Sequence, residues 1–178
     1  MTVPTELGER IAGLLRDVPD FPEPGVLFKD IAPLLADGTV FREAIDAFAE
    51  AARSAGPVDL IAGIEARGFI LAAALAQHLG CGMVPVRKAG KLPPPTVRRT
   101  YDLEYGSAEI EVPVGLIEGR HVYLVDDVLA TGGTAAAAID LIGSAGGTVT
   151  GLGVLLELGF LSGRARLGDM EPLALLQL

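Results

Sequence analysis

The sequence contains few of the residues that support disulfide or metal chemistry: one cysteine and two histidines among 178 residues. A single cysteine, Cys81, cannot form an internal disulfide, and its spacing from His78 and His121 is not that of a metal site. The N-terminal residues also lack the apolar segment of a signal peptide. We therefore expect a cytoplasmic protein whose side chains hold no metal ion directly.

Basic residues and long apolar segments are scarce as well. The chain has 14 Lys and Arg against 23 Asp and Glu, and the formal net charge of −9 argues against a nucleic-acid partner. The one apolar stretch of membrane length, residues 61–79, is interrupted by Glu65 and Arg67, so we expect no membrane span.

Apolar residues, in contrast, make up 50% of the chain, which is enough for the core of a single α/β domain over residues 1–178. Apolar residues at helical spacing predict an opening helix to about Arg16, and helices over residues 41–52, over 69–79 and from Thr134 onward. Short apolar runs predict strands at residues 60–64, 83–86, 110–114, 122–125, 149–156 and 173–176.

Residues 122–134, VYLVDDVLATGGT, combine an apolar run, two adjacent carboxylates and a small-residue loop. The run suits a buried strand, which places Asp126 and Asp127 at its carboxyl end, where open α/β sheets bind ligands. The loop offers backbone N–H groups, two hydroxyls and a helix N-terminus, a combination that suits a phosphate. Because carboxylates repel phosphate but accept hydrogen bonds from sugar hydroxyls, the motif predicts a sugar-phosphate site.

Two other phosphate-binding loops do not match this segment. It lacks the lysine of a Walker loop and the G-x-G-x-x-G spacing of a dinucleotide site. From the residues alone, the remaining alternative is a glycine-rich turn with two solvated acids.

The thirteen-residue string resembles the 5-phosphoribosyl 1-pyrophosphate signature of type I phosphoribosyltransferases, in the version of the branch that uses adenine. The resemblance covers nearly the whole chain and implies a mostly parallel five-stranded sheet flanked by helices, with an N-terminal hood over about residues 1–35. It implies that Asp126 and Asp127 fix the ribose hydroxyls and favour a cationic sugar ring. The residues it assigns to the 5′-phosphate are Ala130, Thr131, Gly132, Gly133 and Thr134.

Basic residues gather in two further segments. Arg67 lies at a predicted strand-to-helix turn, where a guanidinium suits phosphate oxygens, although a solvated or salt-bridged arginine is equally consistent. Arg87, Lys88 and Lys91 predict either a clamp for pyrophosphate or a solvated basic patch. The match to the family's VRKxGKLP segment implies that these residues bind pyrophosphate, with Arg87 reaching it across a homodimer interface. The family's pyrophosphate loop, which includes Arg67, also carries a cis peptide at the position of Glu65.

The segment at residues 21–31, FPEPGVLFKDI, reads as an ordered loop, because its prolines and glycine restrict the path of the backbone. It resembles the family's hood over the purine, which implies that the Leu27 backbone and the Phe28 ring contact adenine. Lys29, at a position where many relatives carry arginine, is included in this adenine site. A solvated lysine is the alternative.

The segment from Pro93 to Thr100 contains three prolines, few apolar residues and two adjacent arginines, so we expect a mobile excursion. Residues 101–106 match the family's YxLEYG segment. This resemblance, together with the segment before it, implies a mobile catalytic lid over about residues 87–106. We expect Glu104 to act as acid/base toward the purine and Tyr105 to serve the pyrophosphate. A hairpin edge is the alternative for both.

The resemblance implies a purine salvage enzyme that joins adenine to 5-phosphoribosyl 1-pyrophosphate, with Mg²⁺ held mainly by the substrate. One alternative is transfer to guanine, xanthine or orotate, against which the FPxPG hood and the LEYG loop argue. The other is a regulator that senses phosphoribosyl pyrophosphate without catalysis. The acidic chain has no basic helix-turn-helix to spare for that role.

Overall fold

The computed structural model describes residues 5–102 and 106–178, and its main sheet has seven strands in the order β5-β6-β4-β3-β7-β8-β9. Five neighbouring strands run parallel. They are β4 (Gly82–Lys88), β3 (Leu60–Ile64), β7 (His121–Leu129), β8 (Thr148–Glu157) and β9 (Leu173–Gln177). The antiparallel hairpin of β5 (Thr96–Asp102) and β6 (Ser107–Pro113) continues the sheet beside β4. The predicted five-stranded parallel sheet is therefore confirmed, with a hairpin added at one edge.

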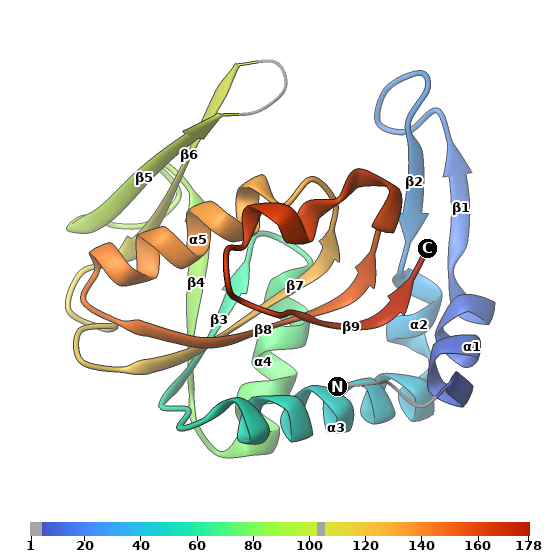
Figure 1. The fold of residues 1–178 in the computed structure, drawn as a ribbon, viewed down its shortest axis with the longest axis horizontal. Helices are drawn as coiled ribbons and strands as arrows, with labels where there is room; N and C mark the ends of the chain where they lie inside the picture. The colour runs from blue at the N-terminus through green and yellow to red at the C-terminus, as the bar shows by residue number, and fades with distance from the viewer. Residues whose placement is uncertain (1–4, 103–105) are drawn as a thin grey trace.

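Helices cover both faces of this sheet (Figure 1). One face carries α1 (Thr5–Leu14), α2 (Ala32–Ala36), α3 (Gly38–Ala55) and α4 (Gly68–Leu79), whereas α5 (Gly133–Ser144) lies on the other. Two short 3-10 helices, η1 (Gly159–Leu161) and η2 (Gly163–Arg166), precede β9. No helix within residues 5–102 and 106–178 is long and apolar enough to cross a membrane.

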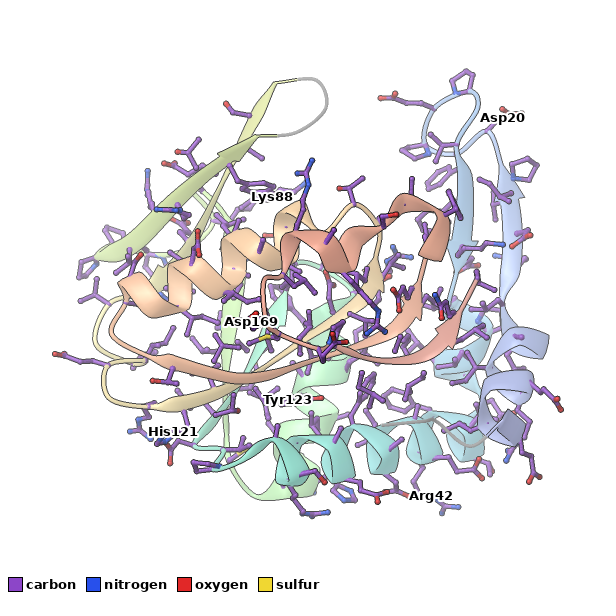
Figure 2. The ribbon with its side chains drawn as sticks, in the orientation of Figure 1. Asp20, Arg42, Lys88, His121, Tyr123 and Asp169 are labelled. Atoms are coloured by element: carbon purple, nitrogen blue, oxygen red, sulfur yellow. The ribbon has the colours of Figure 1, made fainter. Side chains whose placement is uncertain are left out.

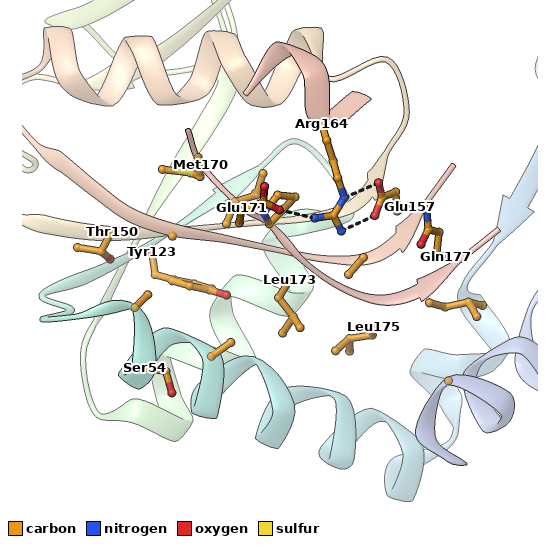
Figure 3. A pocket seen from close by; sticks show the side chains of 18 of the residues that line it. Ser54, Tyr123, Thr150, Glu157, Arg164, Met170, Glu171, Leu173, Leu175 and Gln177 are labelled. Carbon is orange, nitrogen blue, oxygen red and sulfur yellow. Dashed lines mark hydrogen bonds and ion pairs between the residues drawn. The ribbon is translucent and has the colours of Figure 1, made fainter. Parts of the chain in front are cut away.

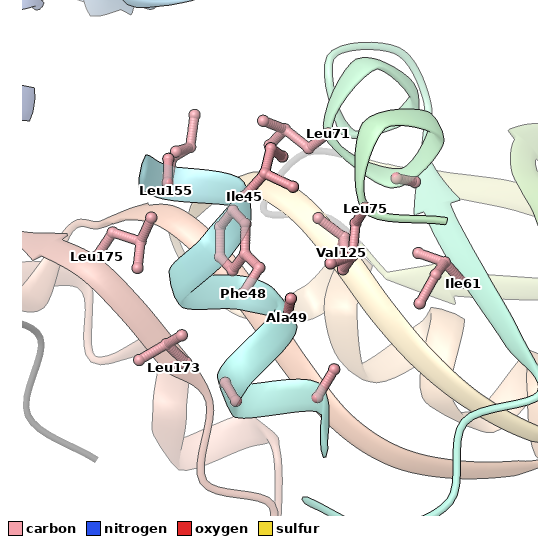
Figure 4. Packing of buried hydrophobic residues seen from close by; sticks show 14 of the residues in the cluster. Ile45, Phe48, Ala49, Ile61, Leu71, Leu75, Val125, Leu155, Leu173 and Leu175 are labelled. Atoms are coloured by element: carbon pink, nitrogen blue, oxygen red, sulfur yellow. The ribbon is translucent and has the colours of Figure 1, made fainter. Parts of the chain in front are cut away.

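The two faces of the buried strands supply two separate apolar clusters, because successive side chains of a strand point in opposite directions. On β7, Tyr123 and Val125 join the cluster of α3 and α4, whereas Val122 and Leu124 join the cluster of α5. Figure 4 shows the first cluster, in which Phe48 of α3 lies among side chains from the sheet and α4. A strand with both faces buried is rigid, so β7 is a firm base for the residues at its carboxyl end.

The predicted second helix is present as α3. The Asp37 side chain caps it by accepting hydrogen bonds from the Thr39 and Val40 N–H groups, both at 3.0 Å. The helix ends at Gly56, as its Gly-Pro sequence predicts, in a backbone conformation with a φ of 137° that favours glycine.

The hood is more regular than the ordered loop that the sequence predicts. Its strands β1 (Arg16–Pro19) and β2 (Leu27–Asp30) pair antiparallel as a separate two-stranded sheet. Ion pairs across the hairpin join Arg16 to Asp30 at 2.6 Å and Lys29 to Asp17 at 2.7 Å. These contacts between strands supply order that the local sequence does not reveal.

The segment from Pro93 to Thr100, for which we expect a mobile excursion, contains regular structure, because β5 begins at Thr96. The two adjacent arginines point to different partners: Arg98 lies 3.1 Å from Glu111, and Arg99 lies 2.8 Å from Asp140 of α5. Each positive charge is therefore balanced by a carboxylate, and the repulsion that argued against order is removed. Val97 also packs on the apolar cluster of α5.

The glycine at position 153 of β8 gives a test of this packing. A Cβ at Gly153 would lie 2.8 Å from Phe48 Cδ1 and 3.0 Å from the Tyr123 hydroxyl oxygen. Gly153→Ala should therefore lower the free energy of unfolding by about 1–3 kcal/mol, since an extra methyl in a packed core forces its neighbours to move. Chemical denaturation measures the change.

The matched control is Gly143→Ala in α5, where a Cβ would meet nothing within 4 Å. Because alanine favours a helix over glycine by about 1 kcal/mol, this variant should be neutral or stabilised. Equal losses in the two variants would contradict the packing argument.

Candidate active site

The site begins where β3 and β7 part. Their pairing ends at Gly63 and Val125, whereas β7 remains paired with β8 as far as Leu129. Asp126 and Asp127 therefore lie inside β7, before its end, but in the part that has no β3 neighbour. The sequence predicted that the two acids follow the end of the strand. This prediction is wrong, because pairing with β8 extends β7 beyond them to Leu129.

The N-terminus of α4 fills the gap that β3 leaves. A Cβ at Gly68 would lie 2.9 Å from the Val125 carbonyl oxygen and 3.0 Å from Asp126 Oδ1. The absence of a side chain at Gly68 lets the helix approach the acidic pair closely. The peptide bond between Glu65 and Ala66, just before this helix, is cis, as the family resemblance implies.

The predicted phosphate loop encloses a small cavity. A space of about 80 Å³ is lined by Asp126 and by residues 128–135, which include all five residues assigned to the 5′-phosphate. Gly132 precedes α5 with a φ of 80°, a conformation that glycine adopts without strain. The structure thus brings one carboxylate, two threonines and the start of a helix together around one cavity.

The segment at Gly163 supports this loop from behind. A Cβ at Gly163 would overlap the Ala130 carbonyl oxygen, and a Cβ at Gly132 would overlap the Gly163 carbonyl oxygen. Arg164 then binds both carboxylate oxygens of Glu157, at 2.7 and 2.6 Å. The sequence did not predict a role for residues 159–164, because a contact between two backbones leaves only glycine as a signal.

The two adjacent acids lie in different surroundings. Asp126 lines the phosphate cavity, where burial raises the pKa of its carboxyl, and the neighbouring Asp127 carboxylate raises that pKa further. Asp127 is 6% exposed and faces Arg67, whose Nη2 lies 2.7 Å from Asp127 Oδ2. This oxygen is paired by charge but accepts no well-aligned hydrogen bond from the described residues.

Arg67 joins the acids to the hood. Its Nη1 donates to the Lys29 carbonyl oxygen at 3.1 Å, and its guanidinium carbon lies 4.6 Å from the centre of the Phe28 ring. Phe28 also meets Phe21 edge to face, with ring centres 5.1 Å apart. Leu27 remains 52% exposed. The predicted base-binding residues therefore surround an apolar surface beside Arg67, although the Lys29 ammonium is directed to Asp17.

Two of the remaining predicted cations, Arg87 and Lys91, lie beside Glu65. Arg87 Nε lies 3.2 Å and Lys91 Nζ 3.8 Å from its carboxylate, which also accepts the Lys88 backbone N–H at 3.0 Å. Burial alone raises the pKa of Glu65, but the hydrogen bonds from Lys88 and Arg87 outweigh it, so the pKa lies below its ordinary value. Figure 2 shows Lys88 near the space between the β5–β6 and β1–β2 hairpins.

Sequence reasoning missed Glu65 and Tyr101 as parts of this site. The Tyr101 hydroxyl lies 3.2 Å from Thr134 Oγ1, so the hairpin touches the phosphate loop. A carboxylate two residues before Arg67, in the predicted pyrophosphate loop, was the available signal for Glu65. Two predicted site residues, Glu104 and Tyr105, lie outside the described residues.

A larger cavity lies away from these residues. A space of about 1050 Å³ lies between α3 and the strands β8 and β9, and Figure 3 shows Tyr123, Leu173 and Arg164 among its lining. Its lining includes none of the residues predicted for the site. The smaller cavity, with its backbone N–H groups and hydroxyls, has the chemistry of an anion site, and volume alone does not identify a site.

Comparison with known proteins agrees with this geometry. A family model of the phosphoribosyl transferase domain matches residues 33–166. The adenine phosphoribosyltransferase of Thermobifida fusca is 57% identical over 172 residues, which cover 96% of this chain and 97% of that one. Its counterpart in Streptomyces coelicolor is 59% identical over 168 residues, with coverage of 94% and 92%.

Solved structures lead to the same family. The adenine phosphoribosyltransferase of Rhodothermus marinus superposes with a TM-score of 0.93 at 47% identity, covering 98% of this chain and all of that one. The Saccharomyces cerevisiae enzyme, complexed with an imino-altritol bisphosphate and adenine, has a TM-score of 0.86 at 36% identity and covers 96% and 98%. The chain therefore belongs to the phosphoribosyl transferase family and, within it, to the adenine phosphoribosyltransferases.

Proposed function

We propose that the chain transfers the phosphoribosyl group of 5-phosphoribosyl 1-pyrophosphate to adenine, a purine salvage reaction that yields AMP and pyrophosphate. The observation that carries the proposal is the meeting of a phosphate loop, an acidic pair and an apolar hood around the gap between β3 and β7. The yeast relative binds a sugar bisphosphate analogue and adenine together, which supports the same pairing of ligands here.

In this reaction the bond from the anomeric carbon to pyrophosphate breaks, and a bond from that carbon to a purine nitrogen forms. Positive charge grows on the ribose ring while the leaving pyrophosphate takes the electron pair. Asp126 and Asp127 accept hydrogen bonds from the ribose hydroxyls and favour the cationic ring. They lie on a strand buried on both faces, so their positions are set before the substrate binds.

The 5′-phosphate binds in the loop of residues 130–134. Backbone N–H groups at the start of α5 and the hydroxyls of Thr131 and Thr134 surround the cavity there. This phosphate takes no part in bond breaking, so its binding energy serves to align the anomeric carbon with the base.

The pyrophosphate is bound by Arg67, Arg87, Lys88 and Lys91, with Tyr105 as a further contact. Without an anionic ligand Arg67, Arg87 and Lys91 have internal partners, since Asp127 holds Arg67 and Glu65 holds Arg87 and Lys91. Pyrophosphate would replace those carboxylates as the partner of each cation.

Mg²⁺ accompanies the substrate and is held mainly by pyrophosphate and ribose oxygens. Carboxylate oxygens suit this ion, and Asp127 Oδ2 is a buried oxygen whose charge is balanced by Arg67 Nη2 at 2.7 Å without a well-aligned hydrogen bond, so the acidic pair would fit a cation held by the substrate. When bound, the ion neutralises part of the charge on the leaving group.

Adenine binds under the hood, with its ring on Phe28 and its edge on the backbone at Leu27. Lys29 contributes through its carbonyl oxygen, which holds Arg67, because its ammonium is paired with Asp17. Glu104 acts as acid/base toward the purine nitrogen. Residues 87–106 form a lid that closes over the ligands, and the contact of Tyr101 with Thr134 joins this lid to the phosphate loop.

The chain works as a cytoplasmic homodimer in this proposal. Arg87 serves the site of the neighbouring subunit, which makes each site depend on two chains. Cys81 is unpaired in the structure, which suits a reducing compartment.

Base specificity tests the reaction directly. Adenine should be consumed roughly ten- to a hundredfold faster than hypoxanthine or guanine, because each reversed donor or acceptor on the base edge leaves a buried partner unpaired. Pyrophosphate release, measured with each base at equal concentration, gives the comparison. Equal rates with all three bases would overturn the assignment of adenine.

The support of the phosphate loop by Gly163 gives a second test. Gly163→Ala should raise the KM for phosphoribosyl pyrophosphate by about tenfold, equivalent to about 1.4 kcal/mol, because the methyl displaces the Ala130 carbonyl from its position. Gly147→Ala is the matched control, since it adds the same methyl against Ile117 beyond the C-terminal end of α5, whereas the loop lies at the N-terminal end of that helix. A KM that stays at the wild-type value in Gly163→Ala would contradict the support role.

The shared site is tested with mixed dimers. Arg87→Ala and Asp127→Ala homodimers should each be nearly inactive, because every site lacks one group. After random exchange, about half the dimers are mixed and each has one complete site, so activity should return to about a quarter of wild type. If mass spectrometry shows exchange but activity stays absent, either Arg87 acts within its own chain or the two sites are coupled.

A further inference from the structure

Glu111 is a buried carboxylate to which the proposed mechanism gives no role. It lies on β6, directly opposite Arg87 of β4, and its exposed fraction is 0%. Moving a carboxylate out of water is costly unless its oxygens accept hydrogen bonds. The partners of Glu111 therefore indicate why a charge is kept at this position.

The two oxygens of Glu111 bind two different segments. Oε1 accepts the backbone N–H groups of Lys91 and Leu92, both at 2.8 Å. Oε2 accepts the Thr96 hydroxyl at 3.0 Å and Arg98 Nε at 3.1 Å. One side chain thus joins the backbone of the basic loop, residues 88–92, to the start of β5.

The carboxylate form is required for this arrangement. Burial alone raises the pKa of Glu111, but the hydrogen bonds from Leu92, Thr96 and Lys91 and the charge of Arg98 outweigh burial, so the pKa lies below its ordinary value. A charged carboxylate accepts hydrogen bonds at both oxygens. A protonated carboxyl or an amide would carry hydrogen on one side and so could not accept from the two donors on that side.

The peptide group between Lys91 and Leu92 is held on both sides. Its N–H, that of Leu92, donates to Glu111 Oε1 at 2.8 Å, and its carbonyl oxygen, that of Lys91, accepts Arg87 Nη1 at 3.0 Å. Arg87 in turn donates to Glu65 at 3.2 Å. Glu111 therefore connects through one peptide group to the side chain that we assign to pyrophosphate.

The two carboxylates near the basic loop differ in what they hold. Glu65 contacts the charged ends of Arg87 and Lys91, so an anionic ligand can compete with it for both. Glu111 holds backbone groups from a fully buried position, which no ligand reaches. The contacts of Glu111 can therefore persist while the cations exchange partners.

We propose that Glu111 is a positioning residue: it holds the backbone of residues 88–92 so that Arg87 and Lys91 meet the pyrophosphate group of the substrate. It acts through the peptide group between Lys91 and Leu92 and does not itself touch the substrate. That the ligand is pyrophosphate rests on the proposed function. The hydrogen bonds of Glu111 are observed in the structure and do not depend on that function.

Three variants separate this role from a general contribution to stability. Glu111→Gln keeps the shape of the side chain but replaces one acceptor oxygen with an N–H₂ donor. Glu109→Gln is the matched control, because Glu109 lies two residues away on β6, also faces Arg98 at 3.6 Å, and is 38% exposed. Thr96→Val removes only the hydroxyl that donates to Oε2 and leaves the loop contacts intact.

Steady-state kinetics should distinguish the variants. In Glu111→Gln, the KM for phosphoribosyl pyrophosphate should rise about tenfold while the KM for adenine changes less than twofold. Both values should stay within twofold of wild type in Glu109→Gln and in Thr96→Val. The proposal is overturned if Glu111→Gln leaves the KM for phosphoribosyl pyrophosphate unchanged or raises the KM for adenine by the same factor. It is also overturned if Glu111→Gln and Thr96→Val change the KM for phosphoribosyl pyrophosphate equally.

Amide hydrogen exchange of the wild-type protein, resolved by residue with NMR, tests the contacts without a mutation. The Lys91 and Leu92 amides should exchange at least tenfold more slowly than that of Gly90, for which no acceptor lies among the described residues. If the Lys91 and Leu92 amides exchanged as fast as the Gly90 amide, the proposal would be overturned. Because this measurement uses the wild-type protein, it tests the proposal even if Glu111→Gln does not fold. If the wild-type protein shows no activity with adenine but its Lys91 and Leu92 amides exchange slowly, the proposed function is contradicted and the hydrogen bonds of Glu111 are not.

Discussion

The parting of β3 and β7 beyond Gly63 and Val125 is the constraint on which the site depends. Because β7 keeps its pairing with β8 as far as Leu129, the strand continues while one of its edges becomes free. The acidic pair lies on that free edge, and α4 approaches it closely at Gly68. Ligands bind at such openings in α/β sheets because helix ends and backbone groups that are not used in strand pairing meet there.

Charge balance is the second constraint. A site that binds a pyrophosphate needs several cations close together, and their mutual repulsion must be offset before the ligand arrives. Asp127 and Glu65 supply the negative charge, at distances of 2.7 to 3.8 Å from Arg67, Arg87 and Lys91. Both face side chains that a ligand can recruit, whereas Glu111 holds the backbone of Lys91 and Leu92 and lies out of reach. An acidic chain can therefore build a site for an anionic substrate.

Much of this protein is determined by sequence that is close together in the chain. Apolar periodicity predicted the helices and the parallel strands, because burial imposes periods of 3.6 and 2.0 on any sequence that forms these elements. The string from Val122 to Thr134 predicted the phosphate loop, because a carboxylate pair, glycines and a helix start are all local features. The family and its reaction followed from the same string and its companions.

Only the tertiary structure decided how these local features meet. The pairing of Arg98 with Glu111 and of Arg99 with Asp140 turns a segment that is poor in apolar residues into a strand. The backbone contact at Gly163 supports the phosphate loop from a segment about thirty residues further along the chain. No local pattern encodes these contacts, because each depends on a partner that the folded sheet brings near. The sequence indicated which groups we assign to the ligand, and the packing around the sheet determined which groups hold them in place.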